Sequence, residues 1–215
     1  GFKPHPVFVE HIKSFNIPMV VLDNYVDSPL VARGGCDSAE GIRQAVRYLW
    51  SKGHDRIGFL GGEPDSIVTI ERKQAYSDAL AELGLVEDPA AVKYGCFSAK
   101  GTKKRILEIA ETGVTAVVCI SDLLACTAVK ELIHAGYSVP EDISVTGYDN
   151  LPPSEYSQPP ITTLSQNRIH IGKTAFFMLQ QMKNGIHIKS VMLRPELIER
   201  ESVREICPRE LPKEK

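Results

Sequence analysis

The stretch Thr115–Asn150, TAVVCISDLLACTAVKELIHAGYSVPEDISVTGYDN, decides the fold class of this chain. It opens with the continuous apolar run 116–120, continues with a helical pattern that ends at Gly136, and closes with a second apolar run, 143–147. A strand without polar alternation is buried on both faces, as in a parallel sheet, and parallel neighbours need a crossover between them. The stretch therefore predicts a βαβ unit with a right-handed connection.

The same alternation of apolar runs and amphipathic helices extends along most of the chain. It predicts strands over 17–23, 56–62, 91–95, 115–121 and 143–149, one or two strands within 190–203, and helices over 38–53, 68–83, 100–113, 122–136 and 168–185. The pattern is typical of an α/β protein with open, Rossmann-like parallel sheets, in which ligands bind beyond the carboxyl ends of the strands. The candidate positions there are Asp23, Gly61–Gly62, Gly95–Phe97, Ser121–Asp122 and Tyr148–Asp149.

Composition and charge favour an ordinary globular protein and do not indicate nucleic-acid binding by this chain alone. Hydrophobic residues make up 43% and charged residues 24% of the chain, and 25 basic against 27 acidic residues leave a net charge of −2. Phosphate binding needs clustered Lys and Arg. The longest basic cluster, Lys100–Arg105, is expected to be the solvated face of a helix. The five cysteines form no CxxC pair, which favours reduced thiols and a cytoplasmic location, with Cys119 and Cys126 in the core.

The sequence predicts no metal site, cofactor or catalytic residue. The six histidines include no HxxxH or HExxH spacing. The stretch FLGGEPDS at 59–66 raises a nucleotide-binding enzyme as an alternative, but it contains neither GxGxxG nor a Walker lysine. No Ser-His-Asp or Cys-His arrangement can be identified. No run approaches the roughly eighteen apolar residues of a membrane span and no signal peptide pattern occurs, so no membrane partner is expected.

The start of the chain predicts a helix over residues 1–16 with no strand before it. A helix in this architecture needs a sheet to cover. We therefore expect further βα units upstream of Gly1 in the intact protein.

With these elements placed, the chain from about Ile17 to Val203 resembles the effector-binding core of the lac/gal repressor family of bacterial transcription regulators. Each motif alone is a weak match, and their common order makes the resemblance specific. The motifs are IPMVVLDNYVD (17–27), GIRQAVRYLWSKGHDRIGFLGG (41–62), ERKQAYSDALAELGL (71–85), the stretch 115–150 with its VPEDISV turn, PPITTLSQ (159–166) and PELIERESV (195–203).

The resemblance implies a periplasmic-binding-protein-like fold of type I, with two parallel-sheet lobes joined by three crossing strands. The N-terminal lobe would comprise residues 1–34 and 165–194 and would be incomplete. The C-terminal lobe would comprise residues 35–164 and 195–215. The prolines of LPPSEYSQPP (151–160) would end the preceding strand without continuing as a helix and would carry the chain back to the hinge.

The resemblance also assigns candidate ligand-binding residues to a cleft between the lobes. Asp149 matches the family's effector-binding acid, with a turn-forming Asp as the alternative. Arg72 matches the cleft arginine, with a solvated helix Arg as the alternative, and Phe97 matches a stacking aromatic, with a core Phe as its rival. Asp23 and Gln166 match positions that contact ligand in some relatives, and a cap or hinge role fits Asp23 equally well. A sugar, with adjacent hydroxyls and an apolar ring face, would use such a set of groups.

Two departures from the family pattern concern the ligand. Ser121 stands where the family commonly has Asn and is a candidate contact, whereas Asp122 is expected to cap the following helix. Cys96 stands where relatives often carry a polar residue. These departures leave a sugar phosphate or a nucleobase as alternatives to a sugar.

The function implied by the resemblance is that of a sugar-sensing core of a transcriptional repressor. Effector binding between the lobes would favour one lobe arrangement and so change operator affinity allosterically. Operator DNA would be bound only through a helix-turn-helix upstream of Gly1, by a homodimer. A periplasmic sugar-binding protein of a transport system is the main alternative, and the cysteine usage and the PELIERESV ending argue against it. An upstream signal peptide or helix-turn-helix would distinguish the two.

Overall fold

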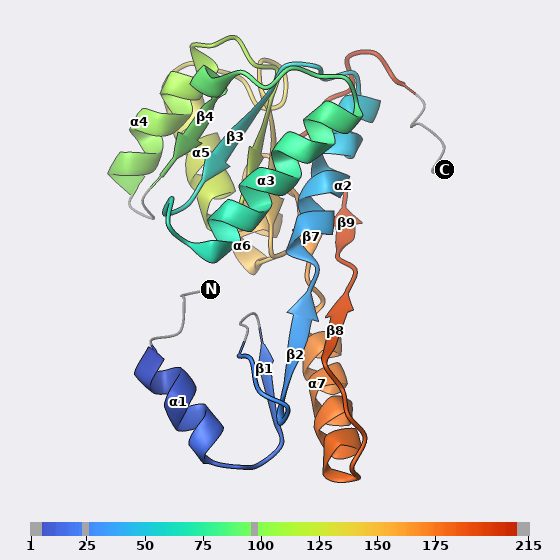
Figure 1. Ribbon diagram of the computed structural model, residues 1–215. Helices are drawn as coiled ribbons and strands as arrows, with labels where there is room; N and C mark the ends of the chain where they lie inside the picture. The colour runs from blue at the N-terminus through green and yellow to red at the C-terminus, as the bar shows by residue number, and fades with distance from the viewer. Residues whose placement is uncertain (1–5, 23–25, 96–98, 210–215) are drawn as a thin grey trace. The chain divides into compact units, whose positions relative to one another are not determined.

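The computed structural model describes residues 6–22, 26–95 and 99–209 and divides into two compact units (Figure 1). Unit 1 comprises Gly1–Asp37 and Gln166–Pro195, and unit 2 comprises Ser38–Ser165 and Glu196–Lys215. The chain therefore passes three times from one unit to the other. Each unit combines helices with a sheet of parallel strands, which confirms the α/β class predicted from the sequence.

Unit 1 contains a parallel sheet in the order β1-β2-β8. Its elements are α1 (Pro6–Ser14), β1 (Met19–Leu22), β2 (Val31–Cys36), α7 (Arg168–Lys183) and β8 (Ser190–Leu193). The central strand β2 was not predicted, because the glycines of VARGGC interrupt the apolar run. The strand is nevertheless buried along most of its length, with Ala32 fully inside.

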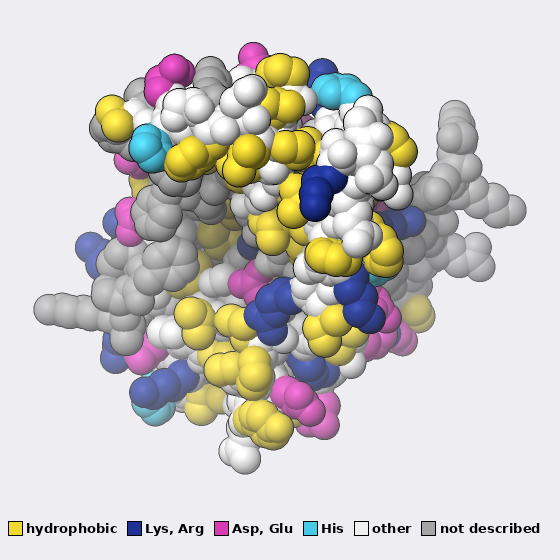
Figure 2. Space-filling model, turned by 90° about the horizontal axis from the view of Figure 1, so that it is seen from below, with side chains coloured by type: hydrophobic (Ala, Val, Ile, Leu, Met, Phe, Trp, Pro, Cys, Tyr) yellow, Lys and Arg dark blue, Asp and Glu magenta, His cyan; other side chains and the backbone are white. Residues whose placement is uncertain are grey.

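The inner side of α7 packs on this sheet, where Met178 and Met182 form a small core cluster with Ala32. Its outer side leaves Phe176 and Phe177 more than half exposed. Figure 2 shows one face of the molecule. Hydrophobic, basic and acidic side chains are interspersed on this face.

Unit 2 contains a larger sheet in the order β4-β3-β5-β6-β7-β9. All its neighbouring strands run parallel except β7 and β9, which are antiparallel. Helices α2 and α3 pack together on one face, and α4 and α5 pack together on the other (Figure 1). The elements are α2 (Ser38–Ser51), β3 (Ile57–Gly61), α3 (Ile67–Glu82), the 3-10 helix η1 (Pro89–Ala91), β4 (Val92–Tyr94), α4 (Ala99–Ala110), β5 (Ala116–Cys119), α5 (Asp122–His134), β6 (Ser144–Tyr148), α6 (Pro152–Tyr156), β7 (Thr162–Ser165) and β9 (Glu196–Ile198).

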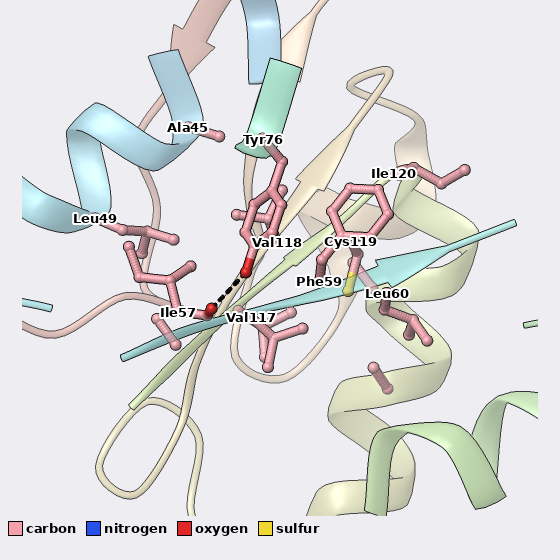
Figure 3. Packing of buried hydrophobic residues seen from close by; sticks show 14 of the residues in the cluster. Ala45, Leu49, Ile57, Phe59, Leu60, Tyr76, Val117, Val118, Cys119 and Ile120 are labelled. Carbon is pink, nitrogen blue, oxygen red and sulfur yellow. Dashed lines mark hydrogen bonds between the residues drawn. The ribbon is translucent and has the colours of Figure 1, made fainter. Parts of the chain in front are cut away.

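The core of unit 2 is formed by the continuous apolar strands and the inner helix faces (Figure 3). Tyr76 of α3 enters this core, where its phenol donates to the Ile57 carbonyl at 2.7 Å and its ring lies 5.0 Å from that of Phe59. A buried phenol needs such a partner. Cys119 is fully buried and Cys126 packs against the same core, so both cysteine placements are confirmed.

Helix α6 corrects the expectation for the proline-rich passage. Pro152 and Pro153 do not prevent a helix but occupy the first turn of α6, with Leu151 as its N-cap. Proline is accommodated there because the first backbone N–H groups of a helix have no intrahelical partner.

The basic cluster lies on α4, as expected. Lys103 and Lys104 are exposed and pair with Glu131 at 3.4 Å and with Glu108 at 3.9 Å, respectively. These residues therefore form a solvated, charge-compensated helix face.

Candidate functional site

Three neighbouring strands of unit 2, β3, β5 and β6, are parallel and end at the same edge of the sheet. The residues that follow β5 and β6 include two sequence-predicted site residues, Ser121 and Asp149. A third, Arg72, reaches this edge from α3. Its Nη1 donates to the carbonyl of Ile120, the residue immediately before Ser121. The structure therefore brings these three predicted residues to one edge, where open α/β sheets bind ligands.

The Arg72 side chain is held rather than solvated. It is only 6% exposed, and its guanidinium carbon lies 3.6 Å from the centre of the Tyr148 ring. Within the described ranges, its Nε has no hydrogen-bond partner. A buried guanidinium with an unused N–H is a fixed donor for an oxygen-bearing ligand, because buried polar groups are normally paired.

Tyr148 completes this arrangement; the sequence placed it among the candidate strand-end positions but assigned it no ligand contact. The residue is fully buried, and a β-carbon at Gly41 of α2 would lie 2.6 Å from its ring. The ring therefore packs directly on the α2 backbone, which glycine permits, and presents its π system to Arg72. The available sequence signal was its position at the end of a predicted strand, immediately before Asp149.

Asp149 begins a loop with unusual backbone geometry. Its φ is +112° and that of Asn150 is +50°, in a region that L side chains rarely adopt. The Asp149 N–H donates to the Leu164 carbonyl at 2.8 Å, which continues the pairing of β6 with β7. Strained backbone of this kind persists where its surroundings hold it, and it occurs often at binding sites.

The helix-capping role predicted for Asp122 is wrong. Ser121, and not Asp122, is the N-cap of α5, since its hydroxyl accepts the Leu124 N–H at 3.3 Å. Asp122 is the first helical residue, and its fully buried carboxylate accepts 2.6 Å hydrogen bonds from the Thr163 hydroxyl and from the Leu151 N–H. Burial raises the pKa of Asp122, although both hydrogen bonds oppose that shift.

The described structure does not test the remaining predicted site residues. Asp23 and Phe97, together with Cys96, lie outside the described residues. Gln166 belongs to unit 1, where it is half-buried just before α7. Their ligand contacts remain predictions.

Within the described residues, no group of three or more His, Cys, Asp or Glu side chains is arranged to hold a metal ion. No helix in the described part of the chain is long and apolar enough to cross a membrane.

Comparison with known proteins agrees with the fold just described. The family model described as "Periplasmic binding protein-like domain" matches residues 46–203. That match runs from within α2 to just beyond β9 and includes Arg72, Ser121 and Asp149. The chain belongs to the periplasmic binding protein-like domain family.

Among the proteins similar to this chain are transcriptional regulators. The chain is 34% identical to the HTH-type transcriptional repressor PurR of Aliivibrio salmonicida over 90% of its own length and 60% of that protein. A solved complex of the regulator CelR with cellobiose shares 27% identity and a TM-score of 0.76, covering 92% of this chain and 71% of the other. A LacI-family regulator from Enterococcus faecium with bound ribose shares 26% identity and a TM-score of 0.81, covering 92% and 75%. The chain thus spans about 60% of the length of the curated relative.

Proposed function

We propose that this chain is the sugar-sensing, effector-binding core of a bacterial DNA-binding transcriptional repressor. The observation that carries the proposal is the buried Arg72 guanidinium, which is fixed on Tyr148 at the strand edge where Asp149 stands. This edge offers a cationic donor fork and, one residue after Tyr148, a carboxylate acceptor. Adjacent sugar hydroxyls can satisfy both at once, because each hydroxyl donates and accepts.

The proposed ligand contacts are Asp149, Arg72, Phe97, Asp23, Gln166 and Ser121, in a cleft between the two lobes. Asp149 would accept two hydroxyl protons, and Arg72 would donate to a ring or hydroxyl oxygen. Ser121 still has its O–H proton to donate, since its oxygen accepts the helix-capping N–H. The ribose and cellobiose bound by the two related regulators support a sugar as the ligand class.

In the intact repressor, ligand binding would favour one arrangement of the lobes and so change operator affinity. The operator would be contacted by a helix-turn-helix outside this sequence, in a cytoplasmic homodimer. A periplasmic sugar-binding protein of a transport system is less well supported, because the relatives named above are transcriptional regulators.

The test is thermal melting of the chain against a panel of monosaccharides, disaccharides, sugar phosphates and purines, with Asp149→Ala as the matched control. A ligand at a hundred times its dissociation constant adds about 2.7 kcal/mol of stability. We expect a stabilising shift with one sugar that disappears in Asp149→Ala. A stabilising shift with a purine alone would support effector binding but make the ligand a purine instead of a sugar. The absence of a shift with any compound would contradict the proposal.

A further inference from the structure

Asp149, Asn150 and Leu151 form a loop after β6 whose first two residues have φ of +112° and +50°. Such a conformation costs free energy and is kept only where neighbouring groups hold it. The contacts that hold this loop therefore also set where the Asp149 side chain begins.

The three backbone N–H groups of the loop identify those contacts. The Asp149 N–H donates to the Leu164 carbonyl at 2.8 Å. The Asn150 N–H donates to the Thr163 hydroxyl at 3.4 Å, and the Leu151 N–H donates to the Asp122 carboxylate at 2.6 Å. The Thr163 hydroxyl in turn donates to the same carboxylate at 2.6 Å. Two of the three backbone contacts therefore depend on Asp122.

Arg200, just after β9, holds the loop by a second route. Its Nη2 donates to the Asn150 side-chain oxygen at 2.8 Å, while its Nη1 donates to the Ile161 carbonyl at 2.8 Å and to the Ser154 hydroxyl at 3.3 Å. The guanidinium thus ties the loop to α6 and to the start of β7. Its planar fork allows this arrangement, which a lysine could not reproduce.

The position of the Asp122 carboxylate is shaped by the sheet beneath it. A β-carbon at Gly147 would overlap the Asp122 carboxylate, so glycine at this place in β6 leaves the space that the carboxylate fills. Asp122 is also fully buried. It is therefore placed to act on the loop rather than to contact a ligand itself.

We propose that Asp122 and Arg200 are positioning residues that hold the Asp149 loop, and hence the Asp149 carboxylate, in its ligand-binding place. The inference rests on the proposed function of the sheet edge, but the holding of the loop can be measured without a ligand.

The first experiment measures amide hydrogen exchange by NMR in the 215-residue chain carrying Asp122→Asn or Arg200→Lys. In Asp122→Asn the side-chain oxygen could still accept one of the two hydrogen bonds, from the Leu151 N–H or from the Thr163 hydroxyl. The NH2 group would face the other donor, so that hydrogen bond would be lost. We expect the amides of Asn150 and Leu151 to exchange about tenfold faster relative to that of Val145, within β6. Equal acceleration at all three amides, which signals global destabilisation only, would overturn the proposal.

Asp142→Asn is the matched control. Asp142 also accepts a backbone N–H, from Ser138 at 2.7 Å, but it precedes β6 at the opposite end of that strand. We expect this variant to leave the relative exchange at Asn150 and Leu151 unchanged. If Asp122→Asn does not fold, Arg200→Lys alone decides the outcome by the same comparison.

The second experiment links the loop to binding, with the compound that stabilises the chain in the melting panel. Asp122→Asn should weaken its affinity about tenfold in the wild-type background and much less in the Asp149→Ala background, because coupled residues are not additive. Equal weakening in both backgrounds would refute positioning through Asp149. If no compound binds, the proposed function fails, and the exchange data still decide whether the loop is held as inferred.

Discussion

The guanidinium of Arg72 lies 3.6 Å above the Tyr148 ring and donates to the carbonyl of Ile120. This contact links α3 to the ends of β5 and β6. It turns an arginine of an amphipathic helix into a fixed, buried cation on Tyr148, the residue before Asp149.

Replacing Arg72 by Lys removes the planar fork while keeping the positive charge. We expect ligand affinity to fall by about tenfold or more and the free energy of unfolding to fall by about 1–2 kcal/mol, because stacking and a buried hydrogen bond are lost. Calorimetry and urea denaturation would measure the two effects.

Arg47→Lys is the control for this substitution, since Arg47 makes an exposed ion pair with Glu82 at 2.8 Å. Such pairs contribute about 0–1 kcal/mol. Equal losses of unfolding free energy and of ligand affinity in Arg72→Lys and Arg47→Lys would show that the contacts of Arg72 contribute nothing specific to stability or binding.

Asp149 should behave differently when replaced by Gly and by Ala. Both substitutions remove the carboxylate, so both should weaken ligand binding by about 2–3 kcal/mol. Only Gly relieves the φ of +112°, and we expect Asp149→Gly to be more stable than Asp149→Ala by about 1 kcal/mol. Unchanged affinity in both variants would reduce Asp149 to a turn residue.

Gly147→Ala should destabilise unit 2, because the new methyl group would overlap the buried Asp122 carboxylate. We expect a loss of about 1–3 kcal/mol in the free energy of unfolding, as for other overpacked interiors. Gly95→Ala is the control, since a β-carbon there would meet its nearest atom at 3.5 Å, an ordinary contact. Similar losses at both positions would show that the space around Asp122 is not critical.

His54 should make stability depend on pH. Its ring is fully buried between the Thr115 hydroxyl at 3.0 Å and the Arg204 carbonyl at 3.1 Å, and burial lowers the pKa of His54. As the pH falls, the His54 imidazole is therefore protonated in the unfolded chain before it is protonated in the folded chain. The free energy of unfolding decreases from about pH 6.5, the ordinary histidine pKa, down to the pKa of His54 in the folded chain. Above about pH 6.5, His54 is neutral in both states and its full contribution to stability is present.

Urea denaturation at several pH values from neutral to mildly acidic would measure this slope in the wild type and in His54→Gln, which keeps a donor for the Arg204 carbonyl. We expect the variant to lose part of the slope. Asp122, whose pKa is raised, acts with the opposite sign in both proteins and cancels in the comparison. Identical slopes would show that His54 does not titrate between the two states.

Much of the fold followed from local patterns. Apart from η1, α6 and β7, the strand and helix order of unit 2 was predicted, because continuous apolar runs and helical periodicity are properties of neighbouring residues. Strand β2 was missed for the same reason, since two glycines and an arginine do not form a local strand pattern. It forms because β1 and β8 pair with it on both sides, and those partners are separated from each other by most of the chain.

The candidate site likewise combines features that depend on neighbouring residues with contacts between distant parts of the chain. The α/β class, the order of most elements and the strand-end places of Ser121 and Asp149 could be predicted from the sequence, because each depends on residues close together in the chain. The contact of Arg72 with Tyr148 and the hydrogen bonds of Asp122 to the Asp149 loop and to Thr163 could not be predicted from the sequence. Those contacts join distant parts of the chain, and they exist only because the order of strands in the sheet brings these parts to one edge.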